Sequence, residues 1–192
     1  MGLSTQTSSA IAPVELASVP SPGWAAVRLR PLTDADVPAI VVACQDGQTQ
    51  RFTTIPIPYT EQDGQEFIAL AASGYANGRN PIFAISTDEH PYAGSIDLRL
   101  DGEGGAEVGF AVAPWARCNG VASSALRTIC DWGFDALALQ RIEWLAFVGN
   151  WGSRRTAERV GFQYEGIARS RCVARGVRHD AWVAALLPGD RH

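Results

Sequence analysis

A loop of six residues, Arg117-Cys118-Asn119-Gly120-Val121-Ala122, combines residue types that suit the binding of phosphate. It follows a strand-like segment that ends at Val112 and opens an apolar helical stretch, so it offers the free backbone N–H groups of a helix N-terminus. Gly120 allows the backbone to approach a ligand closely, and small side chains such as Ser123 do not block it. The guanidinium of Arg117 would add a planar set of donors. The loop therefore predicts an anion site between a strand and a helix.

A carboxylate lies on the strand before this loop. Glu107, Gly109 and Ala111 share one face of a strand expected over 106–112, because side chains alternate between the two faces. A carboxylate beside two small residues leaves room for a substrate and suits a general base that acts through water. The same residue also fits an ordinary solvated charge on a strand. The sequence leaves both interpretations open.

A second polar cluster, Asn150-Trp151-Gly152-Ser153, follows another strand-like segment over 141–148. Ser153 follows Asn150-Trp151-Gly152, a position that suits a helix N-cap. Asn150 fits a turn residue. Trp151 is the tryptophan whose loop position suits an acceptor pocket.

The elements that must position these groups follow from the spacing of apolar residues. A helical stripe predicts one long helix over about 122–137, so the unit over 106–148 reads strand–helix–strand and predicts two parallel neighbouring strands. A loop is expected over 51–59. The other expected strands are 27–30, 82–86, 95–100, 162–174 and 177–187, and the other expected helices begin at Thr33 or Asp36, at Thr60 and at Ser153. This pattern predicts one α/β domain over 24–192, behind a flexible arm over 1–23 that is rich in Ser, Thr and Pro.

Composition excludes several classes of chemistry. All 16 basic residues of the 192-residue chain are Arg, which rules out Schiff-base lysines, pyridoxal phosphate attachment and a P-loop lysine. The four cysteines form no C-x-x-C pair, so we expect no metal. A net charge of −4 gives no reason to expect nucleic acid, and no apolar run suggests a membrane span. We expect a cytoplasmic protein, because residues 1–23 do not resemble a secretory signal.

Several segments, in order, resemble the GNAT superfamily of N-acetyltransferases, and in particular its RimJ/RimL-type branch. Arg117-x-x-Gly120-x-Ala122 resembles the R/Q-x-x-G-x-G/A loop that binds pyrophosphate in that family. The segment over 150–162 resembles the N-x-x-S-x-x-x-A-x-x-x-G-F pattern of the branch. The opening 27–32 and the later 178–180 also resemble it, and the resemblance covers about residues 25–188. Cys118 is a departure, because many relatives carry Gly there.

The resemblance implies the GNAT fold, a twisted, mixed and mostly antiparallel sheet of about seven strands flanked by about four helices, with one splayed parallel pair. It implies acetyl-CoA as co-substrate, no metal, and direct transfer of acetyl to a primary amine in a ternary complex. Glu107 would be the base, and Ser153 would lie near the departing sulfur. The cofactor-binding set implied is Phe110, Ala111 and Val112 through their backbone, then Arg117, Cys118, Asn119, Gly120, Val121, Ala122, Ser123, Asn150 and Ser153.

The acceptor amine is the open question at this stage. The branch favours a protein or peptide N-terminus, whereas a small amine such as an antibiotic or polyamine keeps the same reaction. A non-catalytic acyl-CoA sensor is the third possibility. The loops 51–59 and 175–180 are expected to contact the acceptor, and the basic pair Arg154 and Arg155 either meets phosphates or is solvated. The last strand, over 181–187, either pairs in a homodimer or closes the sheet.

Overall fold

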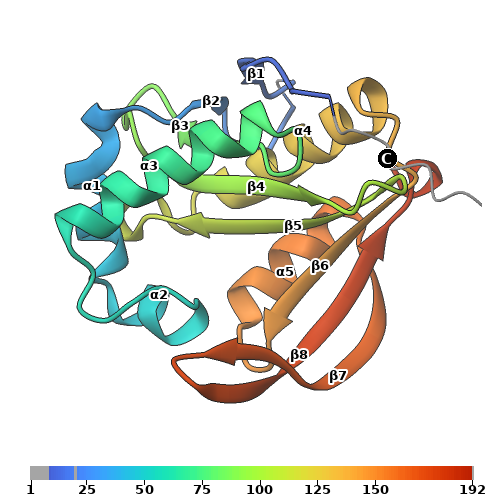
Figure 1. The fold of residues 1–192 in the computed structure, drawn as a ribbon. Helices are drawn as coiled ribbons and strands as arrows, with labels where there is room; N and C mark the ends of the chain where they lie inside the picture. The colour runs from blue at the N-terminus through green and yellow to red at the C-terminus, as the bar shows by residue number, and fades with distance from the viewer. Residues whose placement is uncertain (1–8, 20, 192) are drawn as a thin grey trace, which may run out of the picture.

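The computed structural model describes residues 9–19 and 21–191. These residues form an eight-stranded sheet in the order β1-β2-β3-β4-β5-β6-β8-β7 (Figure 1). All neighbouring strands are antiparallel except β5 and β6. The strands are β1 (Leu16–Ala17), β2 (Arg28–Pro31), β3 (Ile82–Ser86), β4 (Gly94–Leu100), β5 (Gly105–Val112), β6 (Arg141–Phe147), β7 (Gln163–Ala174) and β8 (Val177–Leu186). The mixed, mostly antiparallel sheet is confirmed, with the short β1 added to the seven expected strands.

Five α-helices cover the two faces of this sheet within the described residues. They are α1 (Val37–Cys44), α2 (Gly47–Phe52), α3 (Glu61–Ala76), α4 (Val121–Ala136) and α5 (Trp151–Val160). Helices α1 and α3 pack on one face, and α4 and α5 pack on the other (Figure 1). Helix α2 was not expected. It begins after Asp46, whose side chain caps it by accepting a hydrogen bond from the backbone N–H of Thr49.

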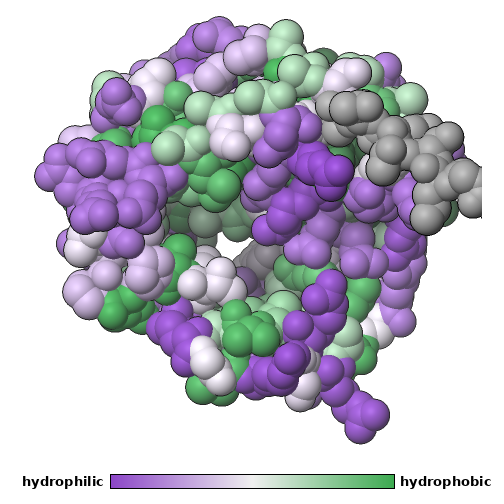
Figure 2. All heavy atoms as spheres, in the orientation of Figure 1, coloured by the Kyte–Doolittle hydropathy of each residue, from purple (hydrophilic) through white to green (hydrophobic). Residues whose placement is uncertain are grey.

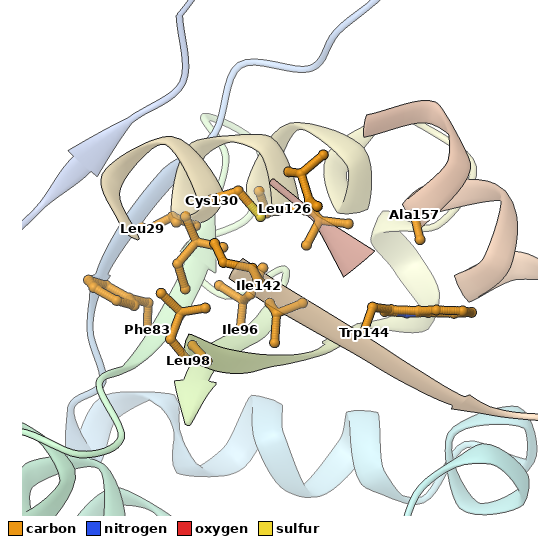
Figure 3. Close-up of a cluster of buried hydrophobic side chains, with 14 of the residues drawn as sticks. Leu29, Phe83, Ile96, Leu98, Leu126, Cys130, Ile142, Trp144 and Ala157 are labelled. Atoms are coloured by element: carbon orange, nitrogen blue, oxygen red, sulfur yellow. The ribbon is translucent and has the colours of Figure 1, made fainter. Parts of the chain in front are cut away.

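The main core lies between α4 and the sheet. Leu126 and Ile129 of α4 are fully buried against Ile96 and Leu98 of β4 (Figure 3). The helical spacing of apolar residues predicts this stripe, and burying each such side chain stabilises the fold by about 1.5–3 kcal/mol. Cys130 lies in the same cluster and is 1% exposed, so its thiol is part of the core (Figure 3).

The parallel pair β5/β6 separates part of the way along. Pairing runs from Gly105 with Arg141 to Val108 with Trp144 and goes no further. Beyond that point β5 continues beside β4, while β6 continues beside β8. The end of β5 therefore has no strand partner on the β6 side. This confirms the splayed parallel pair that the resemblance implied.

The N-terminal arm joins the sheet, in contrast to the flexible arm expected over 1–23. Leu16 and Ala17 pair with β2, and the backbone N–H of Ile11 donates to the carbonyl of Tyr75 over 2.9 Å. Ile11, Val14 and Leu16 pack against the main core. Because the arm is rich in Ser, Thr and Pro, its composition gave no indication of these few apolar contacts. The composition of the chain changes near residue 24, but packing on the core begins before it. Residues 1–8 of the arm lie outside the described residues.

Strand β8 is an inner strand of the sheet. It pairs with β6 on one side and with β7 on the other, so its backbone edges are both used. Of the two expectations for residues 181–187, closing the sheet is therefore the correct one, and a dimer built by pairing this strand is excluded. The described residues also include no helix long and apolar enough to cross a bilayer.

Candidate active site

The loop over 117–122, here named the phosphate loop after the ligand that the sequence predicts for it, follows β5 and a short turn at Pro114–Ala116. It enters α4 at Gly120. Gly120 is the N-cap of α4 with a φ of 78°, a left-handed conformation that glycine adopts without strain. Within the described residues, no hydrogen bond uses the backbone N–H of Val121, Ala122 or Ser123. These groups are the free donors of the helix N-terminus, and the helix dipole adds to their attraction for an anion.

The backbone conformation at Cys118 accounts for the Gly that many members of the resembled family carry at this position. Its φ is 63°, in the left-handed region that costs a residue with a Cβ about 1–2 kcal/mol. Its thiol is exposed and its residue lines the same cavity as the loop. The loop therefore keeps its shape at a small cost in conformational energy.

Arg117, which the sequence predicts to donate hydrogen bonds to phosphate, bonds to α2 and to the end of β5 in this structure. Its guanidinium donates to Asp46 Oδ2 over 2.7 Å and to Thr49 Oγ1 over 2.8 Å, and its Nε donates to the carbonyl of Val112 over 3.2 Å. The Arg117 guanidinium holds the pKa of the Asp46 carboxyl below its usual range. The side chain therefore fastens α2 to the loop, while the first N–H groups of α4 stay free of hydrogen bonds to described residues.

The end of β5 offers backbone groups to a ligand on its free side. The N–H of Ala113 donates toward β4, to the carbonyl of Ala93 over 2.9 Å. Because backbone groups alternate between the two sides of a strand, Phe110 and Val112 face the gap left by β6, and Ala111 faces β4. Of the three residues expected to bind pantetheine, Phe110 thus has both backbone groups on the free side, and Val112 has its N–H there, because its carbonyl accepts from Arg117 Nε. Ala111 contributes to the lining of the cavity only.

A cavity of about 430 Å³ lies where β5 and β6 separate. Its walls are the end of β5, the phosphate loop, the first turn of α4, one side of α5 and, opposite them, α2. Figure 2 shows this face of the molecule hollowed at its centre, in the region where Figure 1 places β5 and α5. All residues of the expected cofactor-binding set line this cavity except Asn119. Sequence reasoning missed the contributions of α2, although Asp46 three residues before Thr49 is a typical capping signal.

Ser153 is a potential proton donor at the inner wall of the cavity. Asn150 is the N-cap of α5, since its Oδ1 accepts from the N–H of Ser153 over 3.2 Å. Helix α5 thus begins at Trp151, and the helix-cap interpretation of Ser153 is wrong. The indole Nε1 of Trp144 donates to Ser153 Oγ over 3.1 Å. Because an indole can only donate, the serine oxygen is the acceptor and its own proton stays available.

Glu107 lies on the face of the sheet opposite α4 and α5. Its Oε1 is 2.9 Å from an Nη of Arg99, and its side chain is 31% exposed. The space expected beside Gly109 is filled, because a Cβ there would lie 2.7 Å from both Asp97 Oδ1 and an Nη of Arg99. Glu107 does not line the cavity. The expectation of open room beside this carboxylate is therefore wrong.

Asp97 is a second carboxyl that the sequence analysis missed. It pairs in register with Gly109, one residue beyond the last pair of β5 with β6. Burial raises the pKa of Asp97 to about 6, and the nearby charge of Glu107 adds to the effect while that of Arg99 opposes it. The alternation of Ser95, Asp97 and Arg99 along β4 is the signal that places this carboxyl on the same face as Glu107.

The two segments expected to contact the acceptor are joined to each other. Arg175, at the tip of the β7–β8 hairpin, donates to the carbonyls of Gln50, Thr53 and Ile55 over 2.9, 3.2 and 3.1 Å. Figure 1 shows the hairpin beside α2. The tip of the hairpin is thus fastened to the end of α2 and to the residues that follow it.

Three further residues take different places on α5. Trp151 packs on Trp182 with ring centroids 4.7 Å apart and does not line the cavity, so its place in an acceptor pocket stays a prediction. Arg154 pairs with Glu158 over 2.8 Å, and its guanidinium lies over the rings of Tyr164 and Trp182. Arg155 lines the cavity and makes no ion pair with any described residue.

The described residues hold no cluster of three or more His, Cys, Asp or Glu side chains suited to a metal.

Comparison with known proteins points to one family. The family described as acetyltransferase (GNAT) domain matches residues 26–163 of the chain. The protein named uncharacterized N-acetyltransferase p20 from Bacillus licheniformis is 30% identical over 169 residues, which cover 84% of this chain and 91% of p20.

Solved structures share the fold. Mycobacterium smegmatis RimJ, solved in complex with CoA-disulfide, superposes with a TM-score of 0.82 at 21% identity and covers 93% of this chain and 89% of RimJ. RimL, described as a ribosomal L7/L12 alpha-N-protein acetyltransferase and solved with coenzyme A, gives a TM-score of 0.74 at 18% identity, with 84% and 93% covered.

Proposed function

We propose that this chain, which belongs to the family of GNAT acetyltransferase domains, transfers the acetyl group of acetyl-CoA directly to the α-amine of a protein or peptide N-terminus. That the chain is an acetyl-CoA-dependent N-acetyltransferase follows from its family. The acceptor is the further step. It is drawn from RimL, whose description names an alpha-N-protein acetyltransferase and whose fold this chain shares.

The cavity has the properties that CoA requires. The free N–H groups at the start of α4 suit the diphosphate. The backbone groups of Phe110 and the N–H of Val112 on the free side of β5 suit the amides of pantetheine, while the Val112 carbonyl already accepts from Arg117. Among the described residues no Asp or Glu lines the cavity, whereas Arg155 does. The single observation that carries the cofactor assignment is therefore a helix start with free N–H groups that lines the same cavity as the end of β5.

Acetyl-CoA supplies the thioester, and two residues would manage the protons: Ser153, which lines the cavity, and Glu107, which lies outside it on the other face of the sheet. Glu107, through water, would accept the proton that the attacking amine loses. The hydroxyl of Ser153 would give its proton to the sulfur as the carbon–sulfur bond breaks. Trp144 supports this role, because its indole occupies a lone pair of Ser153 and leaves the hydroxyl proton available.

The gap between β5 and β6 explains how the two substrates would meet. The cavity is lined by α5 on one face of the sheet and by α2 on the other. Glu107 and Asp97 lie on the α1 and α3 face. A thioester that arrives along α4 and α5 and an amine that arrives past α2 would therefore meet in the gap, which is the geometry that direct attack needs.

The acceptor is tested by thiol release from acetyl-CoA in the presence of N-terminal peptides, aminoglycosides and polyamines. We expect release with peptides that carry a free α-amine and none with the same peptides blocked at the N-terminus. Faster release with an aminoglycoside or polyamine would replace the proposed acceptor. Tight CoA binding without release for any amine would favour a non-catalytic acyl-CoA sensor.

A further inference from the structure

The end of the N-terminal arm, together with Trp24 and Ala25 that directly continue it and are counted with it below, reaches the part of the cavity that Arg159 lines. The ring of Trp24 lies between two arginines, 5.1 Å from Cζ of Arg127 and 4.8 Å from Cζ of Arg159. The carbonyl of Gly23 accepts a hydrogen bond from Arg159. A Cβ on Gly120 would stand 3.5 Å from the backbone nitrogen of Ala25. The arm therefore runs between the start of α4 and the last turn of α5.

Arg159 has a positive charge that no carboxylate of the described residues neutralises. It lines the cavity with Arg155, which lies one turn earlier on the same side of α5. By contrast, Arg117 is paired with Asp46 and Arg154 with Glu158. The cavity thus carries two uncompensated guanidinium groups along α5, in the direction away from Ser153.

The arm holds the Arg159 guanidinium in one place. The ring of Trp24 attracts the cation through its face, and the carbonyl of Gly23 uses one of its donors. An Arg side chain otherwise loses considerable rotamer freedom on binding a ligand, so a side chain fixed beforehand binds more tightly. The remaining donors of the planar group are available to an anion.

We propose that Arg159 binds the 3′-phosphate of CoA and that Trp24, from the N-terminal arm, is the residue that positions it. The proposal rests on the assignment of this cavity to CoA. In CoA the 3′-phosphate lies on the ribose beyond the diphosphate, at the opposite end of the molecule from the thiol. Arg159 is likewise at the opposite end of α5 from Asn150, about 12 Å beyond the first residue of the helix at 1.5 Å per residue. With the diphosphate at the start of α4, the 3′-phosphate falls between Arg159 and the arm.

The test compares CoA with 3′-dephospho-CoA by isothermal titration of the full chain. We expect Arg159→Gln to weaken CoA binding about tenfold or more, because a charge-assisted contact to phosphate is lost, and to change binding of 3′-dephospho-CoA by less than about twofold. Trp24→Ala should weaken CoA binding by about three- to tenfold with the same selectivity. Trp24→Phe keeps an aromatic face and should restore most of that affinity.

Two further variants make the result specific. Arg169→Gln removes the same charge from an exposed position on β7 and should leave the affinities for both ligands unchanged. Because Trp24 acts through Arg159, the double variant should bind CoA no more weakly than Arg159→Gln alone.

Equal losses for CoA and 3′-dephospho-CoA in Arg159→Gln would overturn the assignment to the 3′-phosphate. A Trp24→Ala variant that binds CoA as the wild type does would overturn the positioning role. Failure of the wild-type chain to bind CoA at all would instead overturn the proposed function, so the two failures are distinguishable.

Discussion

Arg117→Gln should destabilise the protein even when no cofactor is bound. The guanidinium joins α2 to the phosphate loop through contacts to Asp46, Thr49 and the carbonyl of Val112. The side chains of Arg117 and Asp46 are 25% and 24% exposed, so solvent screens their ion pair only in part. Substitution by Gln leaves the carboxylate and the carbonyl without these donors.

The magnitude follows from these contacts. A hydrogen bond between charged groups contributes about 1.5–3 kcal/mol and a neutral one about 1 kcal/mol, before any discount for exposure. After that discount, the loss in the free energy of unfolding should be about 2–3 kcal/mol. For a chain of this length, the melting temperature should fall by about 5–10 °C.

Calorimetry of the ligand-free protein measures this loss, with Arg28→Gln as the matched control. Arg28 also pairs with a carboxylate, that of Asp88, but the two side chains are 61% and 78% exposed. Loss of this exposed pair should change stability by no more than about 0.5 kcal/mol. A ligand-free Arg117→Gln protein as stable as Arg28→Gln, combined with weakened CoA binding, would show that Arg117 contacts phosphate and that our reading of its role is wrong.

The pH dependence gives an independent check on the same pair. Because Arg117 lowers the pKa of Asp46 below its ordinary value of 3.8, the pair stabilises the protein at pH values above 3.8. This contribution is lost as the pH falls through the lowered pKa of the folded state. The stability difference between wild type and Arg117→Gln should therefore shrink in acid, as measured by urea unfolding.

Three other substitutions test the chemistry of the site. Ser153→Ala should lower kcat about 10- to 100-fold with little change in the affinity for CoA. The loss of the hydrogen-bond acceptor for Trp144 should also lower the free energy of unfolding by about 1 kcal/mol. Steady-state kinetics and urea unfolding measure the two effects, and an unchanged kcat would remove Ser153 from the mechanism. Glu107→Gln should lower turnover at neutral pH by about 100-fold or more while CoA titrations stay unchanged, and undiminished turnover would discard Glu107 as the base. The pKa of Asp97 is raised from 3.8 to about 6 in the folded state, so this carboxyl destabilises the folded protein as the pH rises between these values, by about 3 kcal/mol at most. Asp97→Asn should abolish this pH-dependent loss of stability. Urea unfolding of both proteins at pH 4 and pH 7 tests this, and a parallel pH dependence would contradict the burial of this charge.

The sequence was sufficient for the parts of the fold that have a strong local signal. The stripe of α4 and the alternation of β5 are periodic over many residues, and the phosphate loop between them has a characteristic spacing. These features predicted where β5, α4 and β6 would meet. The hydrogen-bond partner of Ser153 was beyond such reasoning, because Trp144 comes from a different element nine residues earlier.

Other features depend on contacts between residues distant in sequence. Arg117 was expected to face a phosphate, but Asp46 lies 71 residues away along the chain and its proximity follows only from the fold. The arm was judged by its composition, although a few apolar residues such as Leu16 suffice to anchor it. The room beside Gly109 was inferred from its lack of a side chain, whereas residues of β4 fill that space.

The central claim is that acetyl-CoA and the amine occupy the gap between β5 and β6 together. Initial velocities measured at several concentrations of acetyl-CoA and of an N-terminal peptide test it most directly. Direct transfer in a ternary complex predicts that the double-reciprocal lines intersect. Parallel lines, which are the signature of a covalent acetyl-enzyme, would contradict the account.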